Sequence, residues 1–94
     1  MTTATAKKPI QPKEEIELLV PIEVGGITTN RITMRRPRLA DRIAADKFSG
    51  DIIEKEVWFI ATLCELAPPE LHAMDMADYG QLQDKLNEMQ VFKR

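Results

Sequence analysis

The chain has 94 residues and a formal net charge of −2, with 44% apolar and 30% charged residues. This composition predicts one ordinary globular domain and excludes a disordered chain. No apolar run is long enough for a transmembrane helix, the N-terminus lacks the apolar stretch of a signal peptide, and the single cysteine, Cys64, cannot form an internal disulfide. A reducing cytoplasm is therefore the expected location.

The first predicted elements are an N-terminal tail and a β-hairpin. Residues 1–13 are rich in Thr, Ala, Lys and Pro and predict a flexible tail, so we place a single domain at residues 14–92. Apolar and polar residues alternate over 15–23 and again over 28–36, which is typical of half-buried strands. The first strand has Ile16, Leu18, Val20 and Ile22 on one face, and Pro21 indicates an edge position.

The turn and the strand register can be predicted from the same pattern. A three-residue loop at 24–26 with Gly26 left-handed is one of the common hairpin solutions. Keeping the two apolar faces matched then pairs Leu18 with Ile32 and Ile16 with Met34. It also places Glu15 opposite Arg35.

Three helices and one short turn follow the hairpin. Pro37 precedes a short amphipathic helix over 38–48, which ends at Ser49-Gly50. Asp51 and Glu54 form a capping-box pattern for a second helix that runs to about residue 66. Residues 69–74 predict a short helical turn, and Asp75 is an N-cap for a last helix over 76–91. We therefore expect an α+β fold, with one antiparallel β-hairpin packed against three α-helices.

The second helix has an unusually wide apolar arc. Ile53, Val57, Ile60 and Cys64 form its centre, and Ile52, Phe59, Leu63 and Leu66 widen it past half of the circumference. A helix that covers a two-layer fold needs an apolar arc of only about 100°. This helix is therefore central in the fold, or it offers apolar surface to a partner. Candidate partner-binding residues on it are Phe59, Leu66 and Trp58, which projects from the polar face and either covers a neighbouring element or forms an exposed aromatic anchor.

Charge is distributed unevenly along the chain. Residues 31–42 carry five arginines and one aspartate, a local charge of +4, whereas residues 43–94 carry ten acids and five bases, a local charge of −5. A nucleic-acid-binding domain is expected to be basic overall, so this segment suits an acidic protein or a second copy at least as well as phosphate. Arginine favours directed pairing with carboxylates. The candidate partner-binding arginines are Arg31, Arg35, Arg36, Arg38 and Arg42.

The sequence predicts no catalytic, cofactor-binding or metal-binding residues. Metal sites need several clustered ligands, and this chain has one histidine, His72, and one cysteine. Cys64 lies on the apolar face, where it is expected to be a small buried residue. The Gly25-Gly26 pair is not a phosphate loop, because no Lys-Ser/Thr follows it and the next element is a strand. We therefore expect a protein that is not an enzyme.

The order of these elements resembles the gene-E-type tail assembly chaperones of contractile-tailed phages and prophages. The resemblance covers roughly residues 15–90. It begins with the apolar-Pro-apolar step and Gly turn of Leu19-Val-Pro-Ile-Glu-Val-Gly-Gly26 and with Ile32-Thr-Met-Arg-Arg-Pro37. It is closest at Leu63-Cys-Glu-Leu-Ala-Pro-Pro-Glu-Leu71 and at Met74-Asp-Met-Ala-Asp-Tyr-Gly-Gln-Leu82. The family often has Asp-Gly where this chain has Gly25-Gly26.

The resemblance implies a chaperone that binds the tape measure protein in the host bacterial cytoplasm and is absent from the mature virion. It implies no binding residues, because the family's are not defined by a motif. A wide apolar helix is compatible with helix-in-groove binding of an apolar client, and we expect a weak tendency to self-associate. Two alternatives stay open: a small phage or bacterial regulator that binds nucleic acid through the arginines, and a minor structural tail protein.

Overall fold

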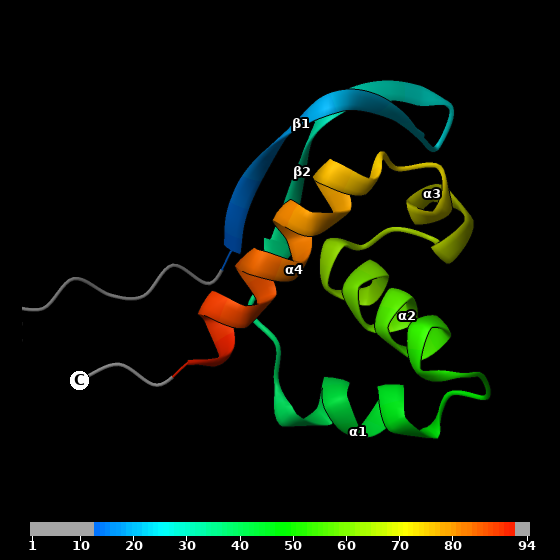
Figure 1. Cartoon of the computed structure of the whole chain (residues 1–94), viewed down its shortest axis with the longest axis vertical. Coiled ribbons are helices and arrows are strands. Elements are labelled where there is room, and N and C mark those ends of the chain that lie inside the picture. Colours follow the sequence, from blue (N-terminus) through cyan, green and yellow to red (C-terminus); the bar gives the residue numbers. More distant parts are fainter. Residues whose placement is uncertain (1–12, 92–94) are drawn as a thin grey trace, which may run out of the picture.

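The computed structural model describes residues 13–91, and Figure 1 shows its elements. Strands β1 (Lys13–Val24) and β2 (Ile27–Arg35) precede α1 (Leu39–Lys47), α2 (Ile52–Cys64), α3 (Pro68–His72) and α4 (Met76–Gln90). The predicted α+β class, with one antiparallel hairpin, three helices and a short extra turn, is confirmed. Residues 1–12 of the predicted tail lie outside the described residues, whereas Lys13 already belongs to β1.

The hairpin turn is shorter than predicted. Gly25 and Gly26 alone connect the strands, with φ angles of 59° and 83°, and Val24 pairs with Ile27. Two successive left-handed residues are typical of a type I′ turn, whose twist matches that of the strands. Glycine adopts these angles without the steric cost that a Cβ would bring. The predicted three-residue loop is therefore wrong.

The predicted strand register is wrong as well, because β1 contains a bulge. Ile16 lies opposite Ile32, and Glu15 lies opposite Thr33. Between the pairs Glu17–Arg31 and Ile22–Thr29, the four β1 residues 18–21 lie opposite a single β2 residue. A register counted from the turn omits such an insertion. Most of the predicted inward face is nevertheless correct, with Ile16, Leu18, Ile22, Ile32 and Met34 all buried.

A carboxylate from α4 stabilises the bulge. Asp78 Oδ1 accepts a hydrogen bond from the Leu19 amide at 2.8 Å, and its Oδ2 accepts one from the Val20 amide at 2.9 Å. Gln81 Nε2 donates to Asp78 Oδ1 at 2.9 Å. The Asp78 side chain is fully buried. Val20, which was predicted to face inward, is 45% exposed in this bulge.

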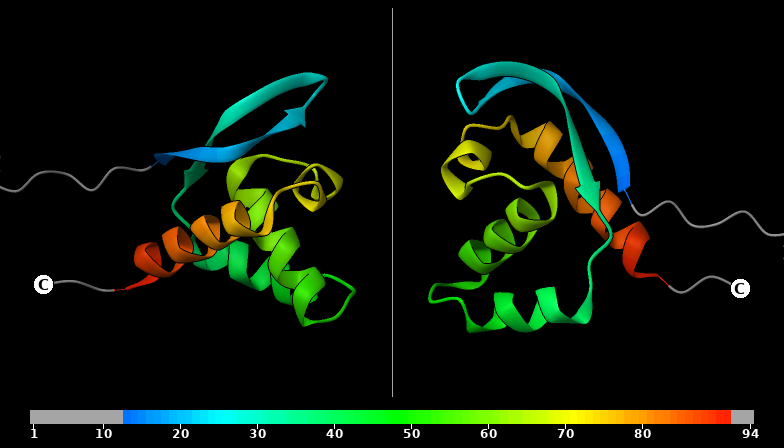
Figure 2. Two further views of the ribbon diagram at one scale, coloured as in Figure 1. Left: turned by 45° about the horizontal axis from the view of Figure 1, so that its top comes forward. Right: turned by 180° about the vertical axis from the view of Figure 1, so that it is seen from behind.

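The hairpin forms one layer and the helices form a second layer beneath it (Figure 2, left). The apolar face of the hairpin packs against α2 and α4, and Ile60, Leu63 and Leu82 are completely or almost completely buried there. The predicted capping box of α2 is present, since Asp51 accepts from the Glu54 amide and Glu54 accepts from the Asp51 amide. The last helix begins after the predicted N-cap Asp75.

Helix α1 lies at the end of the molecule opposite to the hairpin turn (Figure 1). Of the described elements, only α2 packs against it. Ala45 is its buried residue, and the Phe48 ring after its last turn stacks on Trp58 of α2, with 5.6 Å between the ring centroids. A bidentate ion pair between Arg35 and Asp41, with both N–O distances at 2.8 Å, joins α1 to the end of β2.

Candidate functional site

The described residues offer little to catalysis. Among them, no group of three or more His, Cys, Asp or Glu side chains could hold a metal ion. Burial raises the pKa of the Cys64 thiol to about 12, so the thiolate needed for nucleophilic attack is scarce at neutral pH. His72 is exposed in α3. Within residues 13–91, no helix is long and apolar enough to cross a membrane.

The wide apolar arc of α2 is covered along only part of the helix. Ile60 and Cys64 are buried beneath the hairpin, and Val57 is half-buried. Towards the N-terminus of the helix the cover ends, so Ile53 is 71% exposed and Ile52 is 86% exposed. The same apolar surface therefore serves as core at one end of α2 and meets solvent at the other.

Helix α1 adds two more exposed apolar side chains at this end of the molecule. Leu39 is 75% exposed and Ile43, one turn further, is 47% exposed. They share one face of α1, whereas buried Ala45 lies on another. We refer to these four exposed side chains, Leu39 and Ile43 on α1 and Ile52 and Ile53 on the first turn of α2, as the distal apolar surface. Within the described residues these side chains stay between 47% and 86% exposed.

A hollow of about 460 Å³ lies between α1, α2 and α4 next to this surface. Its lining includes four apolar residues, Ala45, Ile52, Phe59 and Leu86. Its other residues are polar or charged, namely Arg42, Asp46, Lys55, Glu56, Asn87 and Gln90. The lining is therefore mixed and mostly polar, but each of the three helices contributes an apolar side chain that an apolar group of a partner could contact.

Three candidate partner-binding residues of α2 and its C-terminal end are buried or half-buried in the structure. Phe59 and Leu66 are only 8% and 9% exposed, so they are core residues and not freely presented to a partner. Phe59 still lines the hollow, and Leu66 lines a different groove beneath β2. Trp58 covers a neighbouring element, because it stacks on Phe48 and is half-buried. The exposed apolar residues of α2 are instead Ile52 and Ile53, which were predicted to belong to its apolar arc but were not among the candidate partner-binding residues.

The predicted arginine segment does not form one continuous patch of unpaired charge. Arg31 pairs with Glu15 at 3.0 Å, and Arg42 pairs with Asp46 at 3.5 Å. Arg35 is held by Asp41, whose pKa the guanidinium lowers to about 2. Arg36 donates to the Met89 carbonyl oxygen at 2.8 Å, and Arg38 is exposed. Three of the five arginines thus pair with carboxylates of the chain itself, which leaves less charge for phosphate binding.

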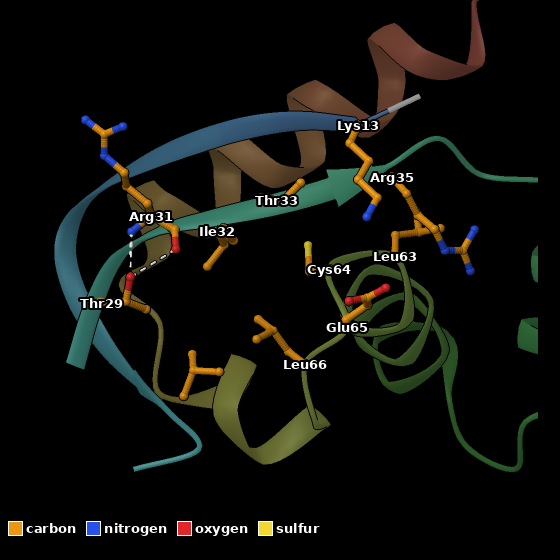
Figure 3. Close-up of a pocket in the computed structure, with 11 residues that line it drawn as sticks. Lys13, Thr29, Arg31, Ile32, Thr33, Arg35, Leu63, Cys64, Glu65 and Leu66 are labelled. Carbon is orange, nitrogen blue, oxygen red and sulfur yellow. Dashed lines mark hydrogen bonds between the residues drawn. The ribbon is translucent and has the colours of Figure 1, made fainter. Parts of the chain in front are cut away.

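A second groove, of about 260 Å³, lies between β2 and the end of α2 (Figure 3). Ile32, Leu63, Cys64 and Leu66 contribute apolar surface to it. Lys13, Arg31, Thr33, Arg35 and Glu65 contribute polar or charged groups. Sequence patterns did not predict this groove, because it depends on which edge of β2 stays open once β1 has paired.

The functional features are thus an uncovered apolar helix end and a strand-edge groove, both of which suit a small protein that binds other proteins. The family described as "Phage tail assembly chaperone proteins, E, or 41 or 14" matches residues 15–90, which is most of the chain. The chain belongs to this family, and the predicted resemblance is confirmed. No curated protein and no solved structure gave a match.

Proposed function

We propose that this protein is a non-enzymatic tail assembly chaperone that binds an apolar helical segment of the tape measure protein. The observation that carries the proposal is the distal apolar surface, where Ile52 and Ile53 continue the core stripe of α2 into solvent. Family membership supplies the tail assembly role. On this proposal the protein acts in the host bacterial cytoplasm and is absent from the mature virion.

The geometry suits an amphipathic helix as the client. Two neighbouring helices, α1 and α2, each present a pair of exposed apolar side chains, and the adjacent hollow has four apolar residues in a mostly polar lining. A client helix can place apolar residues there and keep its polar face towards water. Full burial of one isoleucine side chain contributes about 1.5–3 kcal/mol.

Each single contact is expected to be weak. Association costs at least about 4 kcal/mol in lost translational and rotational freedom, which offsets much of the gain from burying a few isoleucines. Several copies bound along one long client would nevertheless hold it by multivalency. Weak and repeated contacts also suit a chaperone, because each copy must leave when tail tube subunits assemble around the client.

The test is co-expression with the tape measure protein, with solubility and co-purification as the measurements. Ile52→Asp places a charge on the distal apolar surface, and the first turn of α2 tolerates an acidic residue because of the helix dipole. We expect co-purification to fall by about 10-fold or more, as burial of that side chain is lost. The matched control is Met76→Asp, since Met76 is the first residue of α4 and is 78% exposed.

The outcomes separate the proposal from its alternatives. Equal losses in both variants, or no loss in either, would contradict the proposed surface. If the tape measure protein stays insoluble with the unaltered chain, the client assignment is wrong. Recovery of the protein in stoichiometric amounts from purified virions would instead support a structural tail component.

A further inference from the structure

The outer edge of β2 is occupied by the Thr29 side chain at Arg31 and is open to pairing with another strand from Thr33 onwards. In the described residues β2 has β1 as its single strand neighbour. Thr29 Oγ1 accepts from the Arg31 amide and donates to the Arg31 carbonyl oxygen, both at 3.1 Å, so the Arg31 backbone faces away from β1. Alternation along the strand then turns the Thr33 amide towards the same open edge. An exposed row of this kind is a template for strand addition.

The two edges of the hairpin differ in this respect. The outer edge of β1 already has partners from α4, because Asp78 accepts from the Leu19 and Val20 amides and Gln81 Nε2 donates to the Glu17 carbonyl oxygen. The β2 edge instead borders the groove that Figure 3 shows, with Ile32, Leu63 and Leu66 directed into it. The outer edge of β1 is therefore occupied over residues 17–20, which leaves the β2 edge as the better site for a new strand.

The arginines of β2 indicate which kind of strand would fit, and a carboxylate of that strand would share Arg31 with Glu15 and Arg35 with Asp41. Arg31, Thr33 and Arg35 lie on the outward face of β2, and buried Ile32 and Met34 lie on the inward face. An added strand would place alternate side chains beside the arginines and the others over the apolar groove. Strand β1, which pairs with the other edge of β2, is an example of such a strand. Its Glu15 pairs with Arg31, and its Ile16 and Leu18 are buried.

From these observations we propose that the β2 edge binds an extended segment of alternating acidic and apolar residues from a partner protein by strand addition. This site is separate from the distal apolar surface and does not depend on the proposed client. A second copy fits poorly, because pairing β2 with β2 brings arginines together and the outer edge of β1 is occupied. Nucleic acid fits poorly as well, since an oligonucleotide lacks the alternating donors and acceptors of a strand.

The first experiment measures binding of short capped peptides to the full-length protein by fluorescence anisotropy. A peptide of alternating glutamate and valine, about as long as β2, is the probe, and a lysine–valine peptide is its charge control. We expect only the acidic peptide to bind. Arg31→Gln should weaken binding about 2- to 5-fold, as for an exposed ion pair. Arg42→Gln, which removes an equally exposed arginine outside the groove, should leave it unchanged.

A second pair of variants tests whether the backbone of β2 takes part in peptide binding. Thr33→Pro removes an amide that faces away from β1, so the hairpin ladder keeps its hydrogen bonds while strand addition is blocked. We expect at least about 10-fold weaker binding, whereas Thr33→Val, which keeps the amide, should bind normally. Amide exchange in the unaltered protein gives the same test without mutation: on peptide addition, exchange should slow at Thr33 but not at Ile32, whose amide faces β1.

Three results would overturn the proposal. The first is equal binding of the lysine–valine peptide. The second is unchanged exchange at Thr33 when peptide binds, which would place the peptide elsewhere even if Thr33→Pro failed to fold. The third is a different occupant: a single-stranded oligonucleotide that binds with the same Arg31 dependence, or a homodimer that Thr33→Pro dissociates.

Discussion

Asp78 is a buried carboxylate that joins two segments 59 residues apart in the chain. It lies one turn before Leu82 on the buried face of α4, a position at which an apolar residue would be expected. Its partners are two amides of the β1 bulge, which turn away from β2 and have no ladder acceptor. These hydrogen bonds, with that from Gln81, lower the pKa of the Asp78 carboxyl, so the charged form stabilises the fold.

We predict that Asp78→Asn lowers the urea midpoint of unfolding. In asparagine an NH2 donor replaces one of the two carboxylate oxygens, so either the Leu19 or the Val20 amide faces a donor in place of its acceptor. Asp84→Asn, an exposed change in the same helix, should lower the midpoint much less. Because the folded pKa is depressed, the benefit of Asp78 is complete above about pH 5 and is lost as the pH falls through the folded pKa. If the urea midpoints of the unaltered protein and of Asp78→Asn still differ in strong acid, the charged form of Asp78 is not what stabilises the fold.

At the scale of whole elements, the sequence predicted the helices better than the strand pairing. The start of α2 follows from Asp51 and Glu54, and that of α4 from Asp75, all of which act within one turn of their own helix. The strand register depends on Asp78, which approaches β1 only after the chain has folded. The α2 arc likewise predicted spare apolar surface, but only the tertiary cover decides that Ile52 is exposed and Leu66 is buried.

Helix α1 is attached by few contacts, and we predict that acid loosens it first. The Arg35 side chain and the Arg38 amide lower the pKa of Asp41 to about 2. The unfolded chain has the higher pKa, so the Asp41 interactions stabilise the fold above about pH 4 and vanish as the pH falls towards 2. Asp41→Asn should therefore cost about 1–2 kcal/mol of unfolding free energy at pH 7 and almost nothing near pH 2.

Trp58, the single tryptophan, reports on this attachment because it stacks on Phe48 directly after α1. Its fluorescence should change on acidification before the far-ultraviolet circular dichroism of the whole protein does. The control is Asp46→Asn, which breaks an exposed ion pair with Arg42 and should cost less than about 0.5 kcal/mol. If Asp41→Asn and Asp46→Asn lower the unfolding free energy equally, the Arg35–Asp41 pair does not hold α1 in place.

At the scale of the whole molecule, the two candidate surfaces are lined by different residues and differ in chemistry. The distal apolar surface is formed by α1 and the start of α2, and the strand-edge groove borders β2 beneath the hairpin (Figures 1 and 3). A net charge of −2 on 94 residues is small, so long-range repulsion between copies is weak. The exposed isoleucines can therefore bring copies together when no client is present.

We predict weak self-association through the distal apolar surface. Sedimentation or light scattering should show an average mass that rises above the monomer value with protein concentration. Because apolar burial drives this contact, added sodium chloride should not weaken it, and Ile52→Asp should shift the chain towards the monomer while Met76→Asp should not. An association that salt weakens would instead indicate pairing of the arginine segment with the acidic remainder of another copy. A strict monomer at high concentration would mean that the exposed isoleucines are too few to bind without a longer client.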